Sequence, residues 1–259
     1  METSSDEVTD RARPAVEPPE VDDPAVEPAV RWRPNSYLGI LTPATRAAFL
    51  GLGLRRVFAP GQVFIAEGDA DTDLFVLLEG IVKVTAKGVG GDELFVDVQA
   101  QGDTVGELAA INPTAEALPR TATVMAAGDV TAIRIGKPDL DAFFIAHSDA
   151  AVAMAFMLGG RQRQKLRERL DMSGFDATAR LARTLAALEE RLGIPTPRGM
   201  LLDIPLTQTE LATLAVVAEP TVQKALRDLR KDGAIQTGYR AITITDMAAL
   251  RRVGRLPDE

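Results

Sequence analysis

The amino-acid sequence predicts an α+β fold made of three successive regions. From residue 55 to residue 135, short apolar runs alternate with turns that contain Gly or Asp, which is typical of a β-sandwich or jelly-roll barrel. A long helical pattern then extends from residue 148 to about residue 171. The last region combines two short helices across a tight turn with a β-hairpin. Together these observations predict a β-roll, a long helix and a small helical domain.

The composition restricts the classes of function. The chain has 259 residues, of which 46% are hydrophobic and 25% charged, with no Cys and a single His, His147. Disulfides and iron–sulfur clusters are therefore excluded, and we expect no metal site. Since no P-loop or dinucleotide fingerprint is present, we do not expect an enzyme. We find no secretory signal and no run of about 18 apolar residues, so we expect a cytoplasmic protein without a membrane partner.

Residues 1–36 are predicted to form a disordered, acidic and Pro-rich arm. Residues 1–28 contain nine Asp and Glu against two Arg, a net charge of −7 out of −8 for the whole chain. Such a segment buries too little apolar surface to offset the entropy lost on ordering. Only its end, residues 30–36, is a candidate for order, because Trp32 can dock on the folded part of the chain.

The β-roll is assigned to residues 37–147. This region begins with a short helix, with Thr42 as the N-cap and Pro43 at the first helical position. Residues 138–145 are predicted as another short helix at its end. The runs predicted as strands are 56–58, 62–65, 73–78, 81–85, 93–98, 121–124 and 130–135.

Residues 148–174 are predicted as a long helix followed by a hinge. The helix carries an apolar stripe of Val152, Ala155, Phe156 and Leu158. In a monomer this stripe has no obvious partner unless it lies wholly on the β-roll. Residues 172–174 are assigned to the hinge.

Residues 175–259 are predicted as a winged helix-turn-helix, a DNA-binding motif. Thr207 and Glu210 form a capping-box pattern at the start of its first short helix. An ordinary three-helix interaction domain is the alternative, since the net charge from residue 176 onward is only +1 (twelve basic against eleven acidic residues). The predicted elements are helix 175–192, loop 193–199, strand 201–204, helix 207–214, helix 219–231 and hairpin 234–244.

The stretch from Val105 to Thr123 is the leading candidate for a binding site. It opens with the pair Gly106-Glu107, and the pair Arg120-Thr121 begins thirteen residues after Glu107. A guanidinium can bond two oxygens of one phosphate at once. The stretch therefore predicts a pocket for a small phosphorylated ligand.

Turn motifs in the β-roll support a family resemblance. They are Pro60-Gly61, Glu67-Gly68-Asp69, Leu78-Glu79-Gly80 and Gly102-Asp103. With the pairs above, the long helix and the winged helix-turn-helix, the sequence resembles the cyclic-AMP receptor protein / fumarate-and-nitrate-reduction regulator (CRP/FNR) family of bacterial transcription factors over about residues 40–250. The resemblance implies a homodimer paired through residues 148–171, in which effector binding re-poses the DNA-binding domains.

The resemblance also implies the roles of the pocket residues. Glu107 would accept a hydrogen bond from a ribose hydroxyl, and Arg120 and Thr121 would bind the cyclic phosphate. The family's base-contacting hydroxyls are replaced here by Lys165 and Leu166, so the base is not identified. The arginines of the long helix are candidates for an anionic site, with a solvated helix face as the alternative. The predicted nucleotide-binding residues are Gly106, Glu107, Leu108, Ala109, Arg120, Thr121, Arg161 and Lys165.

The predicted DNA-reading helix departs from the family. Family members often carry Ser-Arg-Glu-Thr-Val at its start, whereas this chain has Ala218-Glu-Pro-Thr-Val222. A carboxylate can accept from cytosine but repels phosphate. Val216 stands where the family's turn commonly has Gly. The predicted DNA-binding residues are Thr207, Gln208, Glu219, Thr221, Gln223, Lys224, Arg227, Tyr239 and Arg240.

The sequence thus predicts a homodimeric, ligand-responsive transcription regulator. The expected ligand is a cyclic nucleotide, cyclic AMP or cyclic GMP. The expected partners are double-stranded DNA, a second copy of the chain and RNA polymerase. Two alternatives stay open, namely a nucleotide-sensing interaction protein and a regulator whose pocket binds no ligand.

Overall fold

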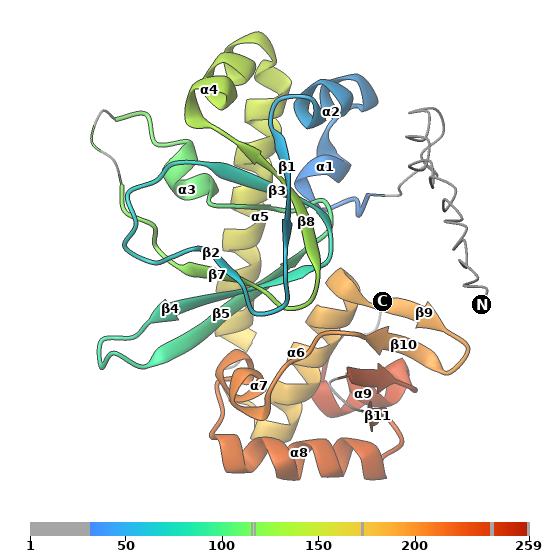
Figure 1. Ribbon diagram of the computed structural model, residues 1–259. Coiled ribbons are helices and arrows are strands. Elements are labelled where there is room, and N and C mark those ends of the chain that lie inside the picture. Colours follow the sequence, from blue (N-terminus) through green and yellow to red (C-terminus); the bar gives the residue numbers. More distant parts are fainter. Residues whose placement is uncertain (1–31, 115, 117, 172–173, 239–240, 258–259) are drawn as a thin grey trace, which may run out of the picture. The chain divides into compact units, whose positions relative to one another are not determined.

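The computed structural model describes residues 32–114, 116, 118–171, 174–238 and 241–257. Two four-stranded sheets form the β-roll, with the strand orders β1-β8-β3-β6 and β2-β7-β4-β5 (Figure 1). All neighbouring strands in both sheets are antiparallel. The strands are β1 (Leu54–Phe58), β2 (Val63–Ile65), β3 (Leu74–Glu79), β4 (Ile81–Lys87), β5 (Glu93–Ala100), β6 (Thr104–Val105), β7 (Thr123–Ala126) and β8 (Val130–Ile135).

Alternation along the strands builds the core between the two sheets. In β4, Val82 points into this core together with Phe75 of β3 and Val124 of β7. Successive side chains of a strand point to opposite faces, so every second residue of β4 is left for contacts outside the roll.

Helices cover the sheet that contains β3 and β8. They are α1 (Tyr37–Ile40), α2 (Pro43–Leu50), α3 (Glu107–Ala110), α4 (Lys137–Ala146) and α5 (Ser148–Asp171). Tyr37, Phe49 and Phe143 pack ring against ring, with neighbouring centroids 5.0 and 5.3 Å apart. These rings share a core with Met154 and Met157 of α5, so the long helix is fixed to the roll over its first turns.

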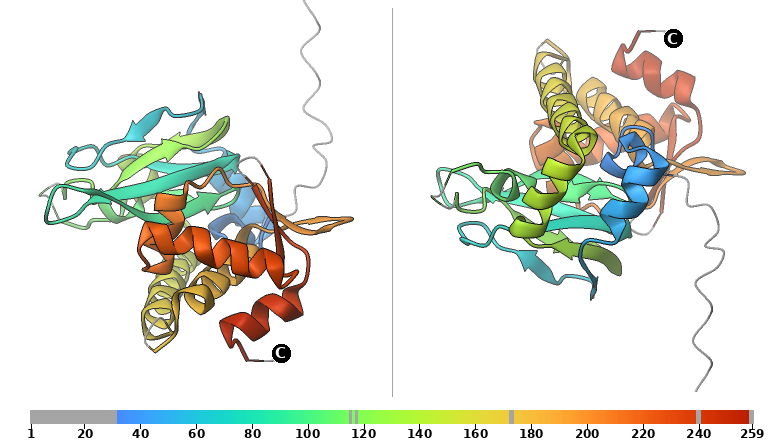
Figure 2. Two further views of the ribbon diagram at one scale, coloured as in Figure 1. Left: turned by 90° about the horizontal axis from the view of Figure 1, so that it is seen from below. Right: turned by 90° about the horizontal axis from the view of Figure 1, so that it is seen from above.

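The C-terminal region is a helical domain with a four-stranded sheet of order β11-β12-β10-β9 (Figure 2). Leucines of α6, α7 and α8 form its core. Phe95 and Val98 of β5 belong to the same buried cluster, so this domain packs directly on the β-roll. Its elements are α6 (Ala177–Leu192), β9 (Ile194–Thr196), β10 (Gly199–Leu202), α7 (Gln208–Ala215), α8 (Glu219–Lys231), β11 (Ile235–Gly238), β12 (Ala241–Ile244) and α9 (Met247–Gly254).

The predicted fold class is confirmed, and several elements differ from the prediction. Residues 193–199 were expected to be a loop, but most of them form the hairpin β9–β10, and the strand predicted at 201–204 ends at Leu202. The strand predicted at 121–124 begins at Thr123, because the chain is still bending at Thr121. The short elements α1, α3 and β6 were not predicted, since too few residues define their periodicity, and the longer helix α9 was also not predicted.

Residues 32–36, at the end of segment 1–36, are ordered on the folded part of the chain, in agreement with their prediction as a candidate for order. Ser36 is fully buried, and its hydroxyl caps α1 by accepting from the Gly39 N–H. Arg33 donates to the backbone oxygens of Gln101 and Arg191. Trp32 packs against the cluster that includes Tyr37, as expected from its docking prediction. The rest of the predicted arm lies outside the described residues.

No single one of the described helices is long and apolar enough to cross a bilayer. Helix α4 and residues 148–167 of α5 meet the length and composition criteria only as a pair, and the two are bent by 111° relative to each other.

Candidate functional site

One cavity of the β-roll contains all eight residues predicted to bind a nucleotide. It has a volume of about 620 Å³, which is within the usual range for small-molecule sites. Its walls come from β4 and β5, from α3 and the segment before β7, and from α5. The predicted residues on these walls are Gly106, Glu107, Leu108, Ala109, Arg120, Thr121, Arg161 and Lys165.

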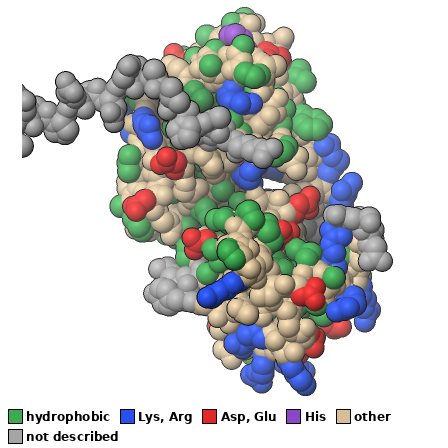
Figure 3. Space-filling model, turned by 90° about the vertical axis from the view of Figure 1, so that its right-hand side faces the viewer, with side chains coloured by type: hydrophobic (Ala, Val, Ile, Leu, Met, Phe, Trp, Pro, Cys, Tyr) green, Lys and Arg blue, Asp and Glu red, His purple; other side chains and the backbone are tan. Residues whose placement is uncertain are grey.

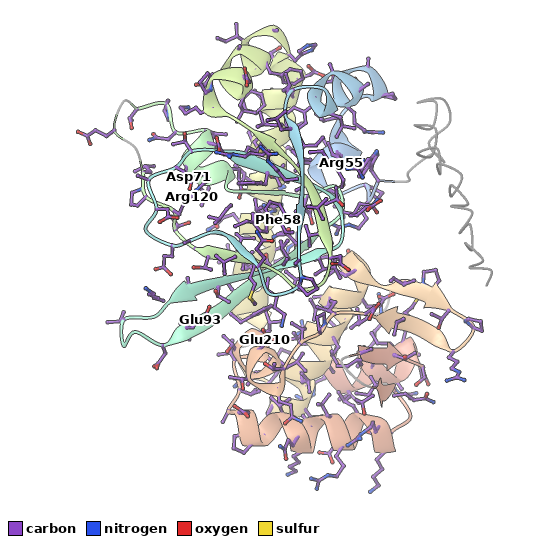
Figure 4. The ribbon with its side chains drawn as sticks, viewed as in Figure 1. Arg55, Phe58, Asp71, Glu93, Arg120 and Glu210 are labelled. Atoms are coloured by element: carbon purple, nitrogen blue, oxygen red, sulfur yellow. The ribbon has the colours of Figure 1, made fainter. Side chains whose placement is uncertain are left out.

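Arg120 is a buried guanidinium held by a ring of acceptors. Its side chain is only 2% exposed, and it pairs with both carboxylate oxygens of Asp71 (Figure 4). It also donates to the backbone oxygens of Gly106, at 2.8 Å, and Asp73, at 2.7 Å. Hydrogen bonds from Arg120, together with its charge, lower the pKa of Asp71 below its ordinary value. The cation is therefore rigidly oriented along the cavity wall.

Gly106 makes this arrangement possible through its backbone. Its φ of +83° lies in the left-handed region, where residues other than Gly are disfavoured. A Cβ at this position would lie 2.6 Å from a guanidinium nitrogen of Arg120 and 2.8 Å from the Asp73 oxygen. Gly106 of the predicted Gly-Glu pair is thus sterically required for seating Arg120.

Glu107 is the buried anion of the cavity. Arg161 of α5 donates to its Oε1 at 3.3 Å, while Oε2 has no hydrogen-bond partner among the described residues. Burial raises the pKa of the Glu107 carboxyl, and the Arg161 charge opposes that rise. An unpartnered buried acceptor on a cavity wall fits a ligand that supplies a hydroxyl donor, such as a ribose.

The arginines of the long helix separate into two kinds. Arg161 turns inward, where it also donates to the Thr104 backbone oxygen and lies 3.7 Å from Asp103. It is therefore not part of a solvated face. Arg163 instead lies over the ring of Phe156, at 5.8 Å from the centroid.

Another part of the cavity wall consists of Lys165 and of polar residues that were not predicted. The Lys165 ammonium donates to the Val96 backbone oxygen at 3.1 Å and lies 3.7 Å from Asp97. Gln99 donates to Asp97 at 3.1 Å. Burial favours the neutral acid of Asp97, but Arg191 and Lys165 outweigh that effect and lower its pKa. Leu166 is 56% exposed and contributes no hydroxyl here.

Sequence reasoning missed Asp71, Asp97 and Gln99 for an identifiable reason. Asp71 lies in the irregular segment between β2 and β3, and its direction follows from the path of that segment. Asp97 and Gln99 lie on a strand whose register shifts opposite Val84 and Thr85, which sends both side chains to the cavity. A bulge of this kind has no sequence signal.

The described residues among those predicted to bind DNA lie at the start of α7 and on α8, and Lys and Arg side chains gather on the lower part of the molecule (Figure 3). The capping box is confirmed, since Thr207 Oγ1 accepts from the Glu210 N–H and Glu210 Oε2 accepts from the Thr207 N–H. Gln223, Lys224 and Arg227 are exposed on α8, whereas Thr221 is half-buried. Tyr239 and Arg240 lie outside the described residues.

The turn between α7 and α8 is strained where the family commonly has Gly. Val216 ends α7 with φ +52°, which is rare for a β-branched residue. Arg180 donates to its backbone oxygen at 2.9 Å. Glu219, at the start of α8, accepts a hydrogen bond from the Thr209 hydroxyl at 2.8 Å. Its carboxylate is thus held beside α7.

Comparison with protein-family models gives two matches. Residues 55–147 match the cyclic nucleotide-binding domain, and residues 179–253 match the Crp-like helix-turn-helix domain. The first match contains the cavity wall from β4 to Arg120, and the second contains α7, α8 and the wing strands.

Known proteins resemble the chain along most of its length. The CRP-like cAMP-activated global transcriptional regulator of Mycobacterium tuberculosis is 26% identical over 198 residues, which cover 76% of this chain and 87% of the relative. The cAMP-activated global transcriptional regulator Vfr of Pseudomonas aeruginosa is 24% identical over 191 residues, or 73% and 88%.

Solved structures agree with these relatives. A CRP-family transcriptional regulator from Thermus thermophilus has a TM-score of 0.63 at 25% identity and covers 79% of this chain and 98% of that chain. FixK2 from Bradyrhizobium japonicum shares the fold with a TM-score of 0.66 at 16% identity, over 78% and 97%. With a cyclic nucleotide-binding domain followed by a DNA-binding helix-turn-helix, the chain belongs to the CRP/FNR family of transcription regulators, which is not a family of enzymes.

Proposed function

We propose that this regulator senses a cyclic nucleotide in the β-roll cavity and changes its DNA binding in response. The observation that carries the proposal is the presence of both a buried cation, Arg120, and a buried carboxyl, Glu107, on the wall of one cavity. A fixed guanidinium suits a cyclic phosphate, and an unpartnered carboxylate oxygen suits a ribose hydroxyl. The Thr121 hydroxyl is exposed beside them and is available to a phosphate oxygen.

Cyclic AMP and cyclic GMP are the leading ligands. The relatives from M. tuberculosis and P. aeruginosa are named as cAMP-activated, which supports a ligand of this class. The base end of the cavity holds a cation at Lys165 and an acceptor at Asp97. This combination can bond the edge of either purine, so the choice of base must be measured.

Calorimetric titration tests the ligand. Cyclic AMP, cyclic GMP and cyclic dinucleotides are titrated into the wild type and into Arg120→Ala. We expect micromolar or tighter binding of one nucleotide, and a loss of at least about 10-fold in the variant, since a buried positive charge and a charge-assisted hydrogen bond to phosphate are removed. Absence of binding by every nucleotide would instead support the alternative of a pocket that binds no ligand.

The proposed active form is a cytoplasmic homodimer paired through residues 148–171. Two large apolar side chains of α5, Val152 and Phe156, are 68% and 61% exposed, which supports a partner helix on this face. Light scattering should report twice the chain mass for the wild type and a smaller mass for Phe156→Glu. RNA polymerase is the further partner expected of such a regulator at a promoter. The boundaries at residues 147/148 and 174/175 remain predictions.

A second candidate function is a nucleotide-sensing interaction protein with weakened DNA recognition. Glu219, Pro220 and Val216 favour it, because they place an acid, an imino acid and a strained turn at the reading helix. Gel shifts over genomic fragments at several salt concentrations decide between the two. A regulator should prefer particular promoters over random DNA, whereas the interaction protein should bind all fragments equally weakly.

A further inference from the structure

The sheet strands β4 and β5 separate the ligand cavity from the DNA-binding domain as a single layer. Val84 and Ala86 of β4 line the cavity, whereas their neighbours Ile81, Lys83 and Thr85 point to the other face. Ile81 packs on the core of the helix-turn-helix domain. The ligand wall and the docking surface are therefore two faces of the same strand.

The register with β5 confirms this division of faces. Lys83 is paired with Val98, and Val98 is fully buried in the helix-turn-helix core. Val84 is paired with Asp97, and both line the cavity. After the bulge, Thr85 is paired with Phe95, which again packs on the helix-turn-helix core.

Lys83 is the charged contact at the centre of the docked face. Its ammonium lies 2.7 Å from each carboxylate oxygen of Glu210 and 2.7 Å from the Pro205 backbone oxygen. Lys83 is only 6% exposed, so this ion pair is largely shielded from solvent. Glu210 lies on α7, below β4 and β5 in the view of Figure 4.

Glu210 joins this contact to the conformation of α7 itself. The same carboxylate accepts from the Thr207 N–H in the capping box that starts the helix. A displacement of Lys83 would therefore act on the first turn of α7, from which Thr207 and Gln208 are predicted to reach DNA. A second link runs through Asp97, which faces the cavity and accepts from Arg191 of α6 at 3.0 Å.

We propose that Lys83 is the positioning residue that seats α7 on the β4–β5 sheet and thereby sets the placement of the DNA-binding domain. The ligand dependence of this placement rests on the proposed function, because the ligand would press on Val84 and Asp97 from the opposite face. Since coupling free energies are reciprocal, the free energy by which a bound ligand changes the docking of α7 equals the free energy by which docking of α7 changes ligand binding.

Distance measurements with spin labels test the proposal directly. The chain contains no Cys, so two labels can be placed without background. Asp92→Cys in the turn after β4 and Asp232→Cys after α8 are both at exposed positions. We expect one narrow distance distribution in the full-length protein and in Lys83→Arg, and a shifted or broadened one in Lys83→Met.

Matched variants separate this role from a general loss of stability. Lys87→Met removes an exposed Lys of the same strand and should leave the distribution unchanged. Glu210→Gln keeps a capping-box side chain but removes the charge partner of Lys83, and should broaden the distribution as Lys83→Met does. An unchanged distribution in both Lys83→Met and Glu210→Gln would overturn the proposal.

Repeating the measurement with cyclic AMP and cyclic GMP separates this proposal from the proposed function. A nucleotide should shift the distribution in the wild type, and Lys83→Met should reduce the shift at least about twofold. An equal shift in both proteins would overturn the coupling role of Lys83. No shift in the wild type, combined with no binding by calorimetry, would contradict nucleotide sensing. The label distances measured without nucleotide would still test whether Lys83 seats α7 on the sheet.

Discussion

The ligand cavity and the DNA-facing helix hold their side chains in opposite ways. In the cavity, Arg120 and Glu107 are buried and fixed by neighbouring groups before any ligand binds. On α8, Gln223, Lys224 and Arg227 are exposed. The side chains of the cavity are therefore preorganised, and ligand binding there requires little loss of side-chain entropy. The exposed side chains of α8 become ordered only when DNA binds. Substitutions should therefore change stability in the first region and mainly binding in the second.

Arg120→Ala should have the largest effect on stability. The variant leaves the Gly106 and Asp73 oxygens without their buried donor, which we expect to cost about 2–3 kcal/mol of unfolding free energy. Chemical denaturation measures the loss. Arg134→Ala is the matched control, because its guanidinium is 51% exposed and pairs with Asp73 at the surface. A similar loss in both variants would contradict the preorganised cavity.

Gly106→Ala should follow, at about 1–3 kcal/mol, because it combines a left-handed φ with a clash against Arg120. Gly61→Ala separates the two causes, since Gly61 has a similar φ of +81° and no atom within 4 Å of an added Cβ. Thermal and denaturant unfolding of both variants give the comparison. If Gly61→Ala costs as much as Gly106→Ala, the contact with Arg120 is irrelevant to stability.

Val216→Gly should stabilise the chain by about 1 kcal/mol or less. Gly removes the strain of a β-branched residue at φ +52°, and the entropy of the more flexible unfolded chain offsets part of that gain. The midpoint of denaturant unfolding measures it. Arg255→Gly at φ +49° is the matched control at another helix end. A destabilised Val216→Gly protein would mean that the Val side chain itself supports the turn.

Glu107→Gln should change how stability depends on pH. The folded-state pKa of Glu107 is raised above its ordinary value of 4.5, so above that pH the folded protein binds more protons than the unfolded chain, and stability falls as pH rises. The amide removes this fall. The melting temperature of the variant should therefore gain on that of the wild type as the pH rises above 4.5. Parallel curves over that range would contradict the burial argument.

Arg227→Ala should have the smallest effect on stability, within about 0.5 kcal/mol, because the side chain is exposed. It should instead weaken DNA binding and reduce the slope of log affinity against log salt by about 1. Fluorescence anisotropy at four salt concentrations measures the slope. Arg55→Ala, at an exposed position of β1, should leave the slope unchanged. Equal slopes in all three proteins would remove Arg227 from the DNA contacts.

The fold class was predictable because its signals are periodic and repeated. Strands of alternating pattern, turn glycines and the capping box at Thr207 each gave a local signal that the structure agrees with. The short elements α1, α3 and β6 were not, since two to four residues carry no period. Helix α9 was overlooked although Asp246 caps it by accepting from the Ala249 N–H.

The residues of the candidate site also include some that were predictable from the sequence and some that were not. Residues that a motif fixes at constant spacing, such as Glu107 and Arg120, were named from the sequence and line one cavity. Residues whose direction depends on a bulge or on an irregular segment, such as Asp97 and Asp71, could not be named. Whether these residues bind a nucleotide remains a prediction for the experiments above.

The single-layer wall of β4 and β5 has a consequence for how such a sensor can diverge. Because Val84 and Lys83 are neighbours in sequence but face different compartments, a substitution at one position need not disturb the other. Substitutions at Val84 and Ala86 can change the lining of the cavity, while Ile81 and Lys83 keep the contact with the DNA-binding domain. An alternating strand thus allows ligand choice and signal transmission to evolve as separate traits.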